Sequence, residues 1–500
     1  MAEKYLTFDL GASSGRAIIC TLNDGKLELN EVHRFVNGPL EKNGTLYWDF
    51  PTICEEIKTG LKKALLNNPD INGIAVDTWG VDYVLFDRST GKIKRLPYHY
   101  RDSRVNNVID RVFKKISKRD IYKRTGIQFM SLNTLYQLAA HNEQYPEDFD
   151  NAIMLFMPDA LTNYLNGELT CEYSIASTSN LLDPVKRDWD FELIRELGLP
   201  EEIFPPLVAP STLSAPLKRE LQVELGCGAI PVIRVGAHDT ASAVAAVPAY
   251  KENSWAYISC GTWALLGAEI NNPLLTPEAE AAPYTNEGGL ENKIRFLTNI
   301  MGTWLLQETK RKWHADGKDL GFPDMALLAA DAQPLKFFID PNDALFVAPG
   351  NIPERICEYC SNTGQGTPAN DGEILRCIYD SLALCFRDKL VKLENILDVK
   401  YDMLNIVGGG TKDTLLMQLA ADSLGIPVLA GPVEATAIGN ALSQAIASGK
   451  VKNLESAREI IRNSFEIIKF IPDGNNKAAW DAGLQKFSAV CDQGYQKHGN

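Results

Sequence analysis

The sequence has no long hydrophobic run and no excess of positive charge. No uncharged apolar stretch approaches the roughly 18 residues that a membrane span needs, and charged residues follow Met1 closely, so we expect neither a membrane anchor nor a signal peptide. Fifty Lys and Arg against 64 Asp and Glu give a formal net charge of −14. This balance disfavours binding to nucleic-acid phosphates or to an anionic membrane surface. We therefore expect a cytoplasmic protein with small-molecule partners, as a monomer or small homo-oligomer.

Cysteine is also sparse, at ten residues in 500. Most cysteines lie singly inside apolar runs, as Cys20 does, which favours buried free thiols over a disulfide framework. Cys357 and Cys360 form one C-x-x-C pair, but Cys377 and Cys385 follow singly, so the spacing does not match a zinc site. The sequence leaves open whether Cys357, Cys360 and Cys377 pair with one another.

The composition is that of a folded protein with more than one core. Apolar residues make up 45% and charged residues 23% of the chain, which disfavours disorder and coiled coil. Since single cores stop growing at roughly 250–300 residues, a chain of 500 residues requires at least two domains.

Two halves of the chain share a pattern of alternating strands and helices. Each begins with a hairpin whose tip carries small or hydroxylated residues, and each later has a strand, a glycine bend and a helix. In the first half the hairpin belongs to a meander that turns at Asn23-Asp24-Gly25. The predicted strands are 5–9, 17–22, 27–35, 71–77, 83–87, 230–235, 255–259, 264–269 and 404–407, and the predicted helices are 52–66, 104–118, 240–246 and 413–424.

This repetition predicts the domain limits. We expect one domain over 1–246, a second over 247–460 and a short C-terminal strand and helix over 461–500. Pro248 and the polar residues that follow it form a plausible linker between the two domains.

The loop at 9–16 is the first candidate for chemistry. Its glycines expose backbone N–H groups, its two serines add hydroxyl donors, and Arg16 adds a charged donor, a combination that suits a phosphate. Asp9 would repel phosphates unless a cation lies between them, so it fits Mg²⁺ held directly or through water. The alternative is a glycine-rich β-turn capped by Asp9. The chain has no G-x-x-x-x-G-K-[ST] sequence and is therefore not a P-loop NTPase.

Two further glycine bends lie in the second half. Gly261 and Thr262 form the tip of its hairpin, and Gly408–Gly410 precede a predicted helix. A triple glycine suits the close approach of a bulky ligand, or else a point where two backbones cross closely. Together with the first loop, these bends predict a nucleotide cleft between the two domains.

Eight blocks of this sequence resemble the FGGY carbohydrate kinases. They lie at 9–16, 77–82, 100–104, 131–138, 238–243, 261–263, 299–302 and 407–410. The resemblance implies an α/β fold of two actin-like ATPase domains (sugar kinase/Hsp70, ribonuclease H-like) with an interdomain active-site cleft. The blocks are most similar to family members that act on L-rhamnulose, so it also implies ATP with Mg²⁺ and L-rhamnulose or a related ketose as substrates.

The resemblance also implies roles for individual residues. Asp239 matches the proton acceptor of the family. The positions that match ATP contacts are Ala12, Ser13, Ser14, Gly15, Arg16, Thr262, Gln307 and Gly409, and those that match sugar contacts are Gly80, His238, Asp239, Thr240 and Asn299. One departure is Asp159, where the family's M-x-P-K segment has lysine. It weakens an assignment to xylulose or glycerol kinases more than it weakens kinase function.

Several of these residues also have a purely structural interpretation. Asp239 is predicted to start a helix, where it is either an ionised base or simply an N-cap. His238 is either a donor to the sugar or a core histidine. Trp79 and Asp82 either supply a wall and a hydroxyl acceptor for the sugar, or Trp79 belongs to the core. The polar residues at 100–104 either line the sugar rim or pair with one another on the surface.

The resulting hypothesis is phosphorylation of the 1-hydroxyl of L-rhamnulose, giving L-rhamnulose 1-phosphate in L-rhamnose catabolism. One alternative is a sister kinase for L-fuculose or D-xylulose. Another is a non-catalytic actin-like sensor of nucleotide or sugar, which the presence of Asp9 and Asp239 disfavours because a sensor needs no base.

Overall fold

The computed structural model describes residues 2–494, which form two compact units that we describe separately. Unit 1 contains Met1–Ala246, Glu269–Leu297 and Ala435–Phe465, and unit 2 contains Val247–Ala268, Thr298–Glu434 and Glu466–Asn500. Each unit is thus built from three separate stretches of chain. The domain limits at 246 and 460 stay predictions.

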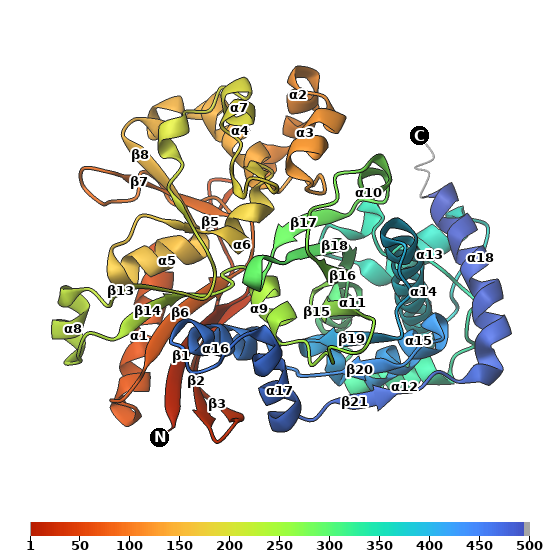
Figure 1. Cartoon of the computed structure of the whole chain (residues 1–500). Helices are drawn as coiled ribbons and strands as arrows, with labels where there is room; N and C mark the ends of the chain where they lie inside the picture. The colour runs from red at the N-terminus through yellow and green to blue at the C-terminus, as the bar shows by residue number, and fades with distance from the viewer. Residues whose placement is uncertain (1, 495–500) are drawn as a thin grey trace. The chain divides into compact units, whose positions relative to one another are not determined.

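The sheet of unit 1 contains the antiparallel meander that the sequence predicts. Asp24 and Gly25, with φ of 48° and 74°, form the turn between β2 and β3. Two later strands extend the sheet parallel to β1, and an antiparallel edge strand follows them, which gives the order β13-β14-β6-β1-β2-β3 (Figure 1). The strands are β1 (Glu3–Leu10), β2 (Ser14–Asn23), β3 (Lys26–Val36), β6 (Gly73–Thr78), β13 (Thr212–Pro216) and β14 (Pro231–Arg234).

Helices cover both faces of this sheet. Successive side chains of a strand point to opposite faces. Gly60 of α1 (Phe50–Asn67) lies so close to Phe8 that a Cβ would be 2.8 Å from its ring. On the other face, the Tyr5 hydroxyl lies 2.9 Å from Ser448 Oγ, just beyond α16 (Ala435–Ala447). The same α16 crosses α9 (Asp239–Ala245) closely, because a Cβ at Gly439 would overlap the backbone of Ser242.

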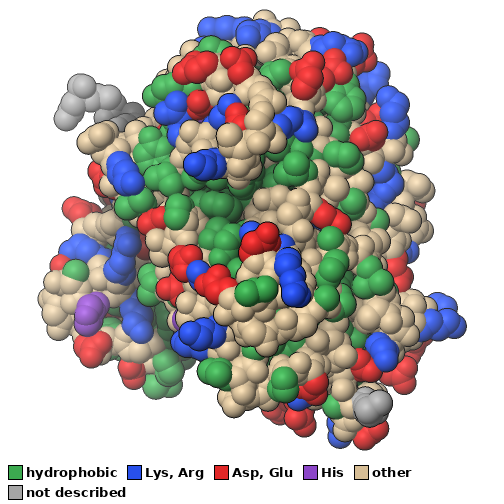
Figure 2. Space-filling view, turned by 90° about the vertical axis from the view of Figure 1, so that its left-hand side faces the viewer, with side chains coloured by type: hydrophobic (Ala, Val, Ile, Leu, Met, Phe, Trp, Pro, Cys, Tyr) green, Lys and Arg blue, Asp and Glu red, His purple; other side chains and the backbone are tan. Residues whose placement is uncertain are grey.

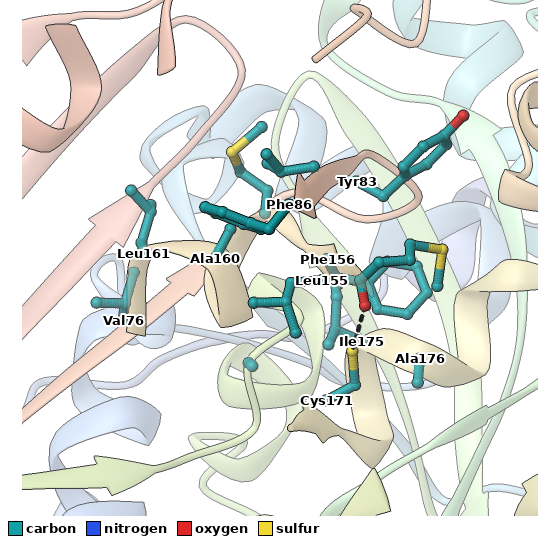
Figure 3. Packing of buried hydrophobic residues seen from close by; sticks show 14 of the residues in the cluster. Val76, Tyr83, Phe86, Leu155, Phe156, Ala160, Leu161, Cys171, Ile175 and Ala176 are labelled. Carbon is teal, nitrogen blue, oxygen red and sulfur yellow. Dashed lines mark hydrogen bonds between the residues drawn. The ribbon is translucent and has the colours of Figure 1, made fainter. Parts of the chain in front are cut away.

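A second group of elements in unit 1 packs around the antiparallel pair β7 (Tyr83–Asp87) and β8 (Ala152–Phe156). Figure 3 shows Phe86 and Phe156 of this pair packed with Leu161 and Ile175 from neighbouring helices. The remaining elements of unit 1 are β4 (Pro39–Lys42), β5 (Thr45–Trp48), α2 (Val108–Lys115), α3 (Lys118–Thr125), α4 (Thr134–Gln144), α5 (Met157–Asn166), β9 (Cys171–Glu172), α6 (Tyr173–Ala176), β10 (Leu182–Asp183), β11 (Asp188–Trp189), α7 (Phe191–Glu196), β12 (Leu207–Val208), α8 (Arg219–Leu225), α10 (Pro277–Ala281), β17 (Thr285–Gly288) and α17 (Leu454–Ser464).

The single helix predicted over 104–118 is wrong. Asn107 adopts a left-handed conformation with φ of 60° just before α2 begins. Ser117 then caps α3, because its side chain accepts a hydrogen bond from the Asp120 backbone. A left-handed residue and a serine cap therefore break a pattern that reads as one amphipathic helix.

Unit 2 repeats the sheet connectivity of unit 1. Its strands β18, β16, β15, β19, β20 and β21 are neighbours in that order, with β15 antiparallel to β16 and parallel to β19. The elements are β15 (Trp255–Cys260), β16 (Trp263–Ile270), β18 (Ile294–Met301), α11 (Trp304–Ala315), α12 (Phe322–Asp331), α13 (Ile352–Asn362), α14 (Asp371–Leu397), β19 (Met403–Val407), α15 (Thr414–Leu424), β20 (Val428–Ala430), β21 (Ile468–Phe470) and α18 (Lys477–Gln493). The end of β16 and the first half of β18, up to Leu297, belong to unit 1.

The topology corrects one detail of the predicted repeat. β19 lies beside β15 as β6 lies beside β1, and β20 then occupies the place of β14. The segments 230–246 and 404–424, which the sequence pattern pairs, are therefore not counterparts. The counterpart of β14 and α9 is β20 and α16.

The C-terminal strand β21 and helix α18 belong to unit 2, whereas residues 461–465 still belong to unit 1. β21 pairs antiparallel with β20, and α18 buries Trp480, Phe487 and Val490. All ten cysteines lie within the described residues and are free thiols, which confirms the expectation for Cys20. None of the helices that the structure describes combines the length and apolar composition of a membrane span.

Candidate functional site

The loop between β1 and β2 is a tight hairpin tip in unit 1. The Gly11 N–H donates to the Ser14 carbonyl over 2.9 Å, and Asn37 Nδ2 donates to the Gly11 carbonyl over 2.8 Å. The Ser13 side chain is exposed, and Ala12 and Ser14 are partly buried. The loop therefore offers hydroxyl and backbone groups on a fixed frame.

Gly15 has a structural role as well. A Cβ at this position would overlap the Phe35 ring of β3. Packing alone therefore explains a glycine at 15, whereas it does not explain the two serines.

Asp9 and Arg16 form an ion pair beside this loop. Arg16 Nη2 lies 2.5 Å from Asp9 Oδ2, and the two strands β1 and β2 place the residues directly opposite each other. On the other side of β1, Asp77 of β6 is in register with Asp9. Two carboxylates and a guanidinium therefore lie at the same end of the sheet.

Asp77 is a fully buried carboxyl that the sequence analysis did not single out. Burial, and then the negative charge of Asp9, raise its pKa well above the ordinary range. Asn440 of α16 donates to Asp77 Oδ2 over 2.6 Å, whereas Oδ1 accepts no hydrogen bond from the described residues. The signal that could have found it is its place at the end of a strand, within the block 77–82.

These carboxyl oxygens suit a hard cation. Among residues 2–494, no group of three His, Cys, Asp or Glu side chains is arranged to hold a metal. Mg²⁺ usually takes one or two protein carboxylates and completes its shell with water and phosphate oxygens. The unpartnered Oδ1 of Asp77 beside Asp9 is the feature in the structure that points to such a ligand.

Four of the predicted sugar contacts come together in unit 1. The Thr78 N–H donates to the Ala237 carbonyl over 2.9 Å, which joins the loop after β6 to the loop after β14. As a result, a Cβ at Gly80 would lie 3.3 Å from His238 Nε2. Asp239 Oδ1 lies 3.5 Å from the same nitrogen and accepts a 3.1 Å hydrogen bond from Thr240 Oγ1. Gly80, His238, Asp239 and Thr240 thus form one cluster.

Asp239 does not act as a helix cap. It is the first residue of α9, and the N-cap position is His238, whose side chain makes no capping hydrogen bond. The carboxylate is 31% exposed. It is therefore available to a ligand, and the N-cap alternative is wrong.

A buried glutamate supports the loop before Asp239. Glu172 is completely buried and accepts hydrogen bonds from Ser174 Oγ over 2.5 Å and from the Ala237 N–H over 3.1 Å. Ser174 Oγ in turn accepts a 3.4 Å hydrogen bond from the His238 N–H. Sequence reasoning missed Glu172, whose function depends on contacts with residues far along the chain.

The structure also explains the departure at Asp159. Arg234 Nη1 donates to Asp159 Oδ1 over 3.0 Å, and both side chains are buried. The Glu172 N–H donates to the same oxygen over 3.0 Å. The aspartate therefore belongs to a buried network with an arginine from β14.

The proposed sugar-acceptor role of Asp82 is wrong. Its carboxylate accepts hydrogen bonds from Trp48 Nε1 (2.6 Å), Trp79 Nε1 (3.0 Å) and Gln137 Nε2 (2.8 Å), and it is 1% exposed. The rings of Trp79 and Trp48 pack at a tilt of 34° with their centroids 4.0 Å apart, and Trp79 is buried, so it belongs to the core. Arg104 donates to Gln137 over 2.9 Å, and its Nε lies 3.9 Å from Asp102 Oδ1. Two of the polar residues at 100–104 thus pair with each other, but they do so in a buried network and not on the surface.

The predicted ATP contacts of unit 2 lie around the β15–β16 hairpin. Thr262 Oγ1 donates to Gln307 Oε1 over 3.2 Å, and Gln307 Nε2 donates to Thr303 Oγ1 over 2.9 Å. Asn299, the remaining candidate for a sugar contact, lies half-buried on β18 in unit 2.

The triple glycine after β19 packs against Cys260 at the end of β15. Gly408 has φ of 93°, and a Cβ there would lie 2.9 Å from the Cys260 carbonyl oxygen. A Cβ at Gly410 would overlap the Cys260 thiol, whereas a Cβ at Gly409 would meet nothing within 4 Å. Close backbone packing therefore explains two of the glycines and leaves Gly409 open to a ligand.

Comparisons with known proteins cover almost the whole chain. The models for the N-terminal and C-terminal domains of the FGGY family of carbohydrate kinases match residues 4–246 and 256–448. The chain is 41% identical to a rhamnulokinase from Bacteroides thetaiotaomicron, over 97% of this chain and 99% of that protein. It is 39% identical to a rhamnulokinase from Bacillus subtilis, over 94% and 95%.

Solved structures share the fold at low sequence identity. A gluconate kinase from Lactobacillus acidophilus matches with a TM-score of 0.81 at 15% identity, covering 99% of this chain and 98% of that one. A ligand-bound xylulose kinase from the same organism gives 0.78 at 15%, with 98% of each chain covered. The expected α/β fold class, that of a two-domain sugar kinase, is confirmed.

Proposed function

Because the chain belongs to the FGGY family of carbohydrate kinases, we propose that it transfers the γ-phosphoryl group of ATP to the 1-hydroxyl of L-rhamnulose, with Asp239 as general base. Enzymes of this family use ATP, generally with Mg²⁺. The choice of L-rhamnulose is supported by the two rhamnulokinases described above, to which the chain is 41% and 39% identical over nearly its whole length. The product would be L-rhamnulose 1-phosphate, an intermediate of L-rhamnose catabolism.

The observation that carries the proposal is the cluster around Asp239. Its partly exposed carboxylate lies 3.5 Å from His238 Nε2 and next to the side-chain-free position of Gly80. A sugar hydroxyl placed there would meet a hydrogen-bond donor and a proton acceptor together. Thr240, which donates to one oxygen of Asp239, would steady the carboxylate.

The proposed reaction does not need a strong base. Phosphoryl transfer passes through a loose transition state, so the protein mainly aligns the hydroxyl with the γ-phosphate and stabilises the charge on its oxygens. The attacking hydroxyl becomes acidic late in the transfer, and a carboxylate within reach is then an adequate acceptor. Asp239 would take that proton while His238 orients the sugar.

Each unit carries candidate contacts for phosphate. Ser13, Ser14 and Arg16 would donate to phosphate oxygens in unit 1. Thr262, Gln307 and Gly409 are the ATP contacts proposed in unit 2. Asp9 would hold Mg²⁺ directly or through water, and the ion would neutralise charge on the phosphates.

The alternatives differ in their support. The comparisons give no support to a non-catalytic sensor, because the matched family and the relatives described above are kinases. A sister kinase for L-fuculose or D-xylulose would share the ATP residues. The xylulose kinase among the solved structures is only 15% identical and bears on the fold alone.

A ketose panel tests the proposal. Purified protein with ATP and Mg²⁺ is given L-rhamnulose, L-fuculose or D-xylulose, and ADP release is followed for the wild type and for Asp239→Asn. We expect the highest kcat/KM on L-rhamnulose and a loss of about 10²–10⁴-fold in kcat for Asp239→Asn. Asp319→Asn is the control, because that side chain is 91% exposed. Equal turnover of another ketose would contradict the substrate, and near-normal kcat of Asp239→Asn would contradict the base.

A further inference from the structure

A buried arginine and glutamate lie against the histidine of the proposed sugar site. The strands β17 and β18 are neighbours (Figure 1). Glu287 of β17 is in register with Arg295 of β18, and Arg295 Nη2 lies 3.1 Å from Glu287 Oε2. Arg295 is completely buried and Glu287 is 6% exposed. Neither residue stands out in the sequence.

Both side chains reach the inner nitrogen of His238. Nδ1 lies 3.2 Å from Arg295 Nη2 and 3.2 Å from Glu287 Oε2. Only the arginine contact has the geometry of a hydrogen bond, since Glu287 Oε2 accepts none from the described residues. A guanidinium has no acceptor and does not lose a proton in proteins. In this hydrogen bond Nδ1 must therefore be the acceptor.

The tautomer follows from that direction. A neutral imidazole carries one proton, so an accepting Nδ1 places the proton on Nε2. Nε2 is the nitrogen that lies 3.5 Å from Asp239 Oδ1 and beside Gly80. The N–H would thus point toward the region where the sugar hydroxyl is proposed to bind.

The guanidinium is itself held in place. Arg295 Nε donates to the Gly288 carbonyl over 2.8 Å, and the Gly288 N–H donates to Ser177 Oγ over 2.7 Å. Burial opposes the ionisation of Glu287, but the neighbouring Arg295 and His238 together outweigh it and lower the pKa of the glutamate. Glu287 therefore balances a buried positive charge that would otherwise be costly.

We propose that Arg295 is a positioning residue that keeps His238 in the Nε2-protonated tautomer, so that His238 donates a hydrogen bond to a substrate oxygen. The inference rests on the proposed function, because it takes His238 as a sugar contact. Asp239 then remains free to accept a proton. The site would favour a sugar whose oxygen at this position accepts a hydrogen bond.

The tautomer can be measured without substrate. Protein labelled with ¹⁵N at histidine is studied by long-range ¹H–¹⁵N correlation NMR, and the His238 signals are assigned by their loss in His238→Gln. We expect a protonated Nε2 and an unprotonated Nδ1 in the wild type. Arg295→Met should let Nδ1 take up a proton and donate it to Glu287. Arg458→Met, which removes another buried arginine of unit 1 with a glutamate partner at 2.6 Å, should leave His238 unchanged. A wild-type protein with the proton on Nδ1 overturns the proposal, as does an unchanged tautomer in Arg295→Met.

Kinetics supply an independent readout. Arg295→Met should raise the KM for the sugar about tenfold, as expected for a misdirected hydrogen bond, and leave the KM for ATP unchanged.

If Arg295→Met does not fold, two variants of His238 still test which nitrogen carries the proton. The amide nitrogen of glutamine mimics Nε2–H and that of asparagine mimics Nδ1–H, so His238→Gln should retain more activity than His238→Asn. The reverse order overturns the proposal. Failure of the wild type to phosphorylate L-rhamnulose, with Nε2 protonated, would instead refute the proposed substrate.

Discussion

The three adjacent glycines Gly408–Gly410 look equivalent in the sequence but differ in their contacts with Cys260. Gly408 and Gly410 lie against its backbone and thiol, whereas Gly409 is exposed and has open space beside it. The sequence predicts either ligand approach or backbone crossing for all three. The structure separates the two roles by position.

This separation predicts different effects for two neighbouring substitutions. Gly410→Ala should lower the free energy of unfolding by about 1–3 kcal/mol, because the added methyl group overpacks against the Cys260 thiol. Gly409→Ala should leave stability unchanged and raise the KM for ATP, with the sugar KM as an internal control. Denaturant unfolding and steady-state kinetics of both variants check this. Equal loss of stability in the two variants would contradict the assignment.

His141 predicts an acid-sensitive element of stability. It is 3% exposed, and burial, with the charge of Arg104, lowers its pKa from 6.5 to about 4 despite a 3.1 Å contact with Asp148. The unfolded state thus binds more protons between these values, so stability is complete above pH 6.5 and falls as the pH drops toward 4. The shift corresponds to a loss of up to about 3 kcal/mol.

Unfolding by denaturant at pH 7, 6, 5 and 4.5 measures this effect. The stability of the wild type should fall more steeply with acidification than that of His141→Gln. His314→Gln is the control, because that side chain is 74% exposed, and it should follow the wild type. Parallel curves for the wild type and His141→Gln would contradict the prediction.

At the residue scale, the local sequence pattern predicts the candidate site residues that lie on loops at the ends of strands. His238, Asp239 and the serines of the first loop were visible because glycines and hydroxyl residues mark such loops. Glu172, Glu287 and Arg295 were not visible, because a charged residue inside a strand or before a short helix reads as exposed. All three contact the segment at 237–238, which is far away in the chain, and linear spacing does not contain these contacts.

At the scale of elements, the sequence predicts individual strands and short turns more reliably than it predicts which element of one half is the counterpart of which element of the other. The meander of β1, β2 and β3 follows from alternation and from an Asp-Gly turn. The counterpart of α9 was misassigned, because many strands in α/β proteins are followed by glycine and a helix. Only the order of strands in the sheets identifies α16.

The C-terminal helix α18 should contribute to the stability of unit 2. Trp480 is 3% exposed, so Trp480→Ala should lower the free energy of unfolding by about 3–5 kcal/mol. Lys486→Ala, on the exposed side of the same helix, should stay within about 0.5 kcal/mol of the wild type. Chemical denaturation of both variants tests this. A Trp480→Ala protein as stable as the wild type would show that α18 is dispensable.

For the whole molecule, the net charge of −14 bears on how an anionic substrate is captured. On the face drawn in Figure 2, acidic and basic side chains are interspersed. An overall negative field does not attract ATP. Binding would then depend on local donors, such as the serines and Arg16 of the first loop, and on a bound cation.

Identification of the product tests the central claim most directly. The protein is incubated with ATP, Mg²⁺ and L-rhamnulose, and the phosphorylated sugar is analysed by ¹H–³¹P correlation NMR. The account predicts one sugar phosphate whose phosphorus couples to the methylene protons of C1, formed in equal amount with ADP. A phosphorus coupled to any other position, or ADP formed without a sugar phosphate, would contradict it.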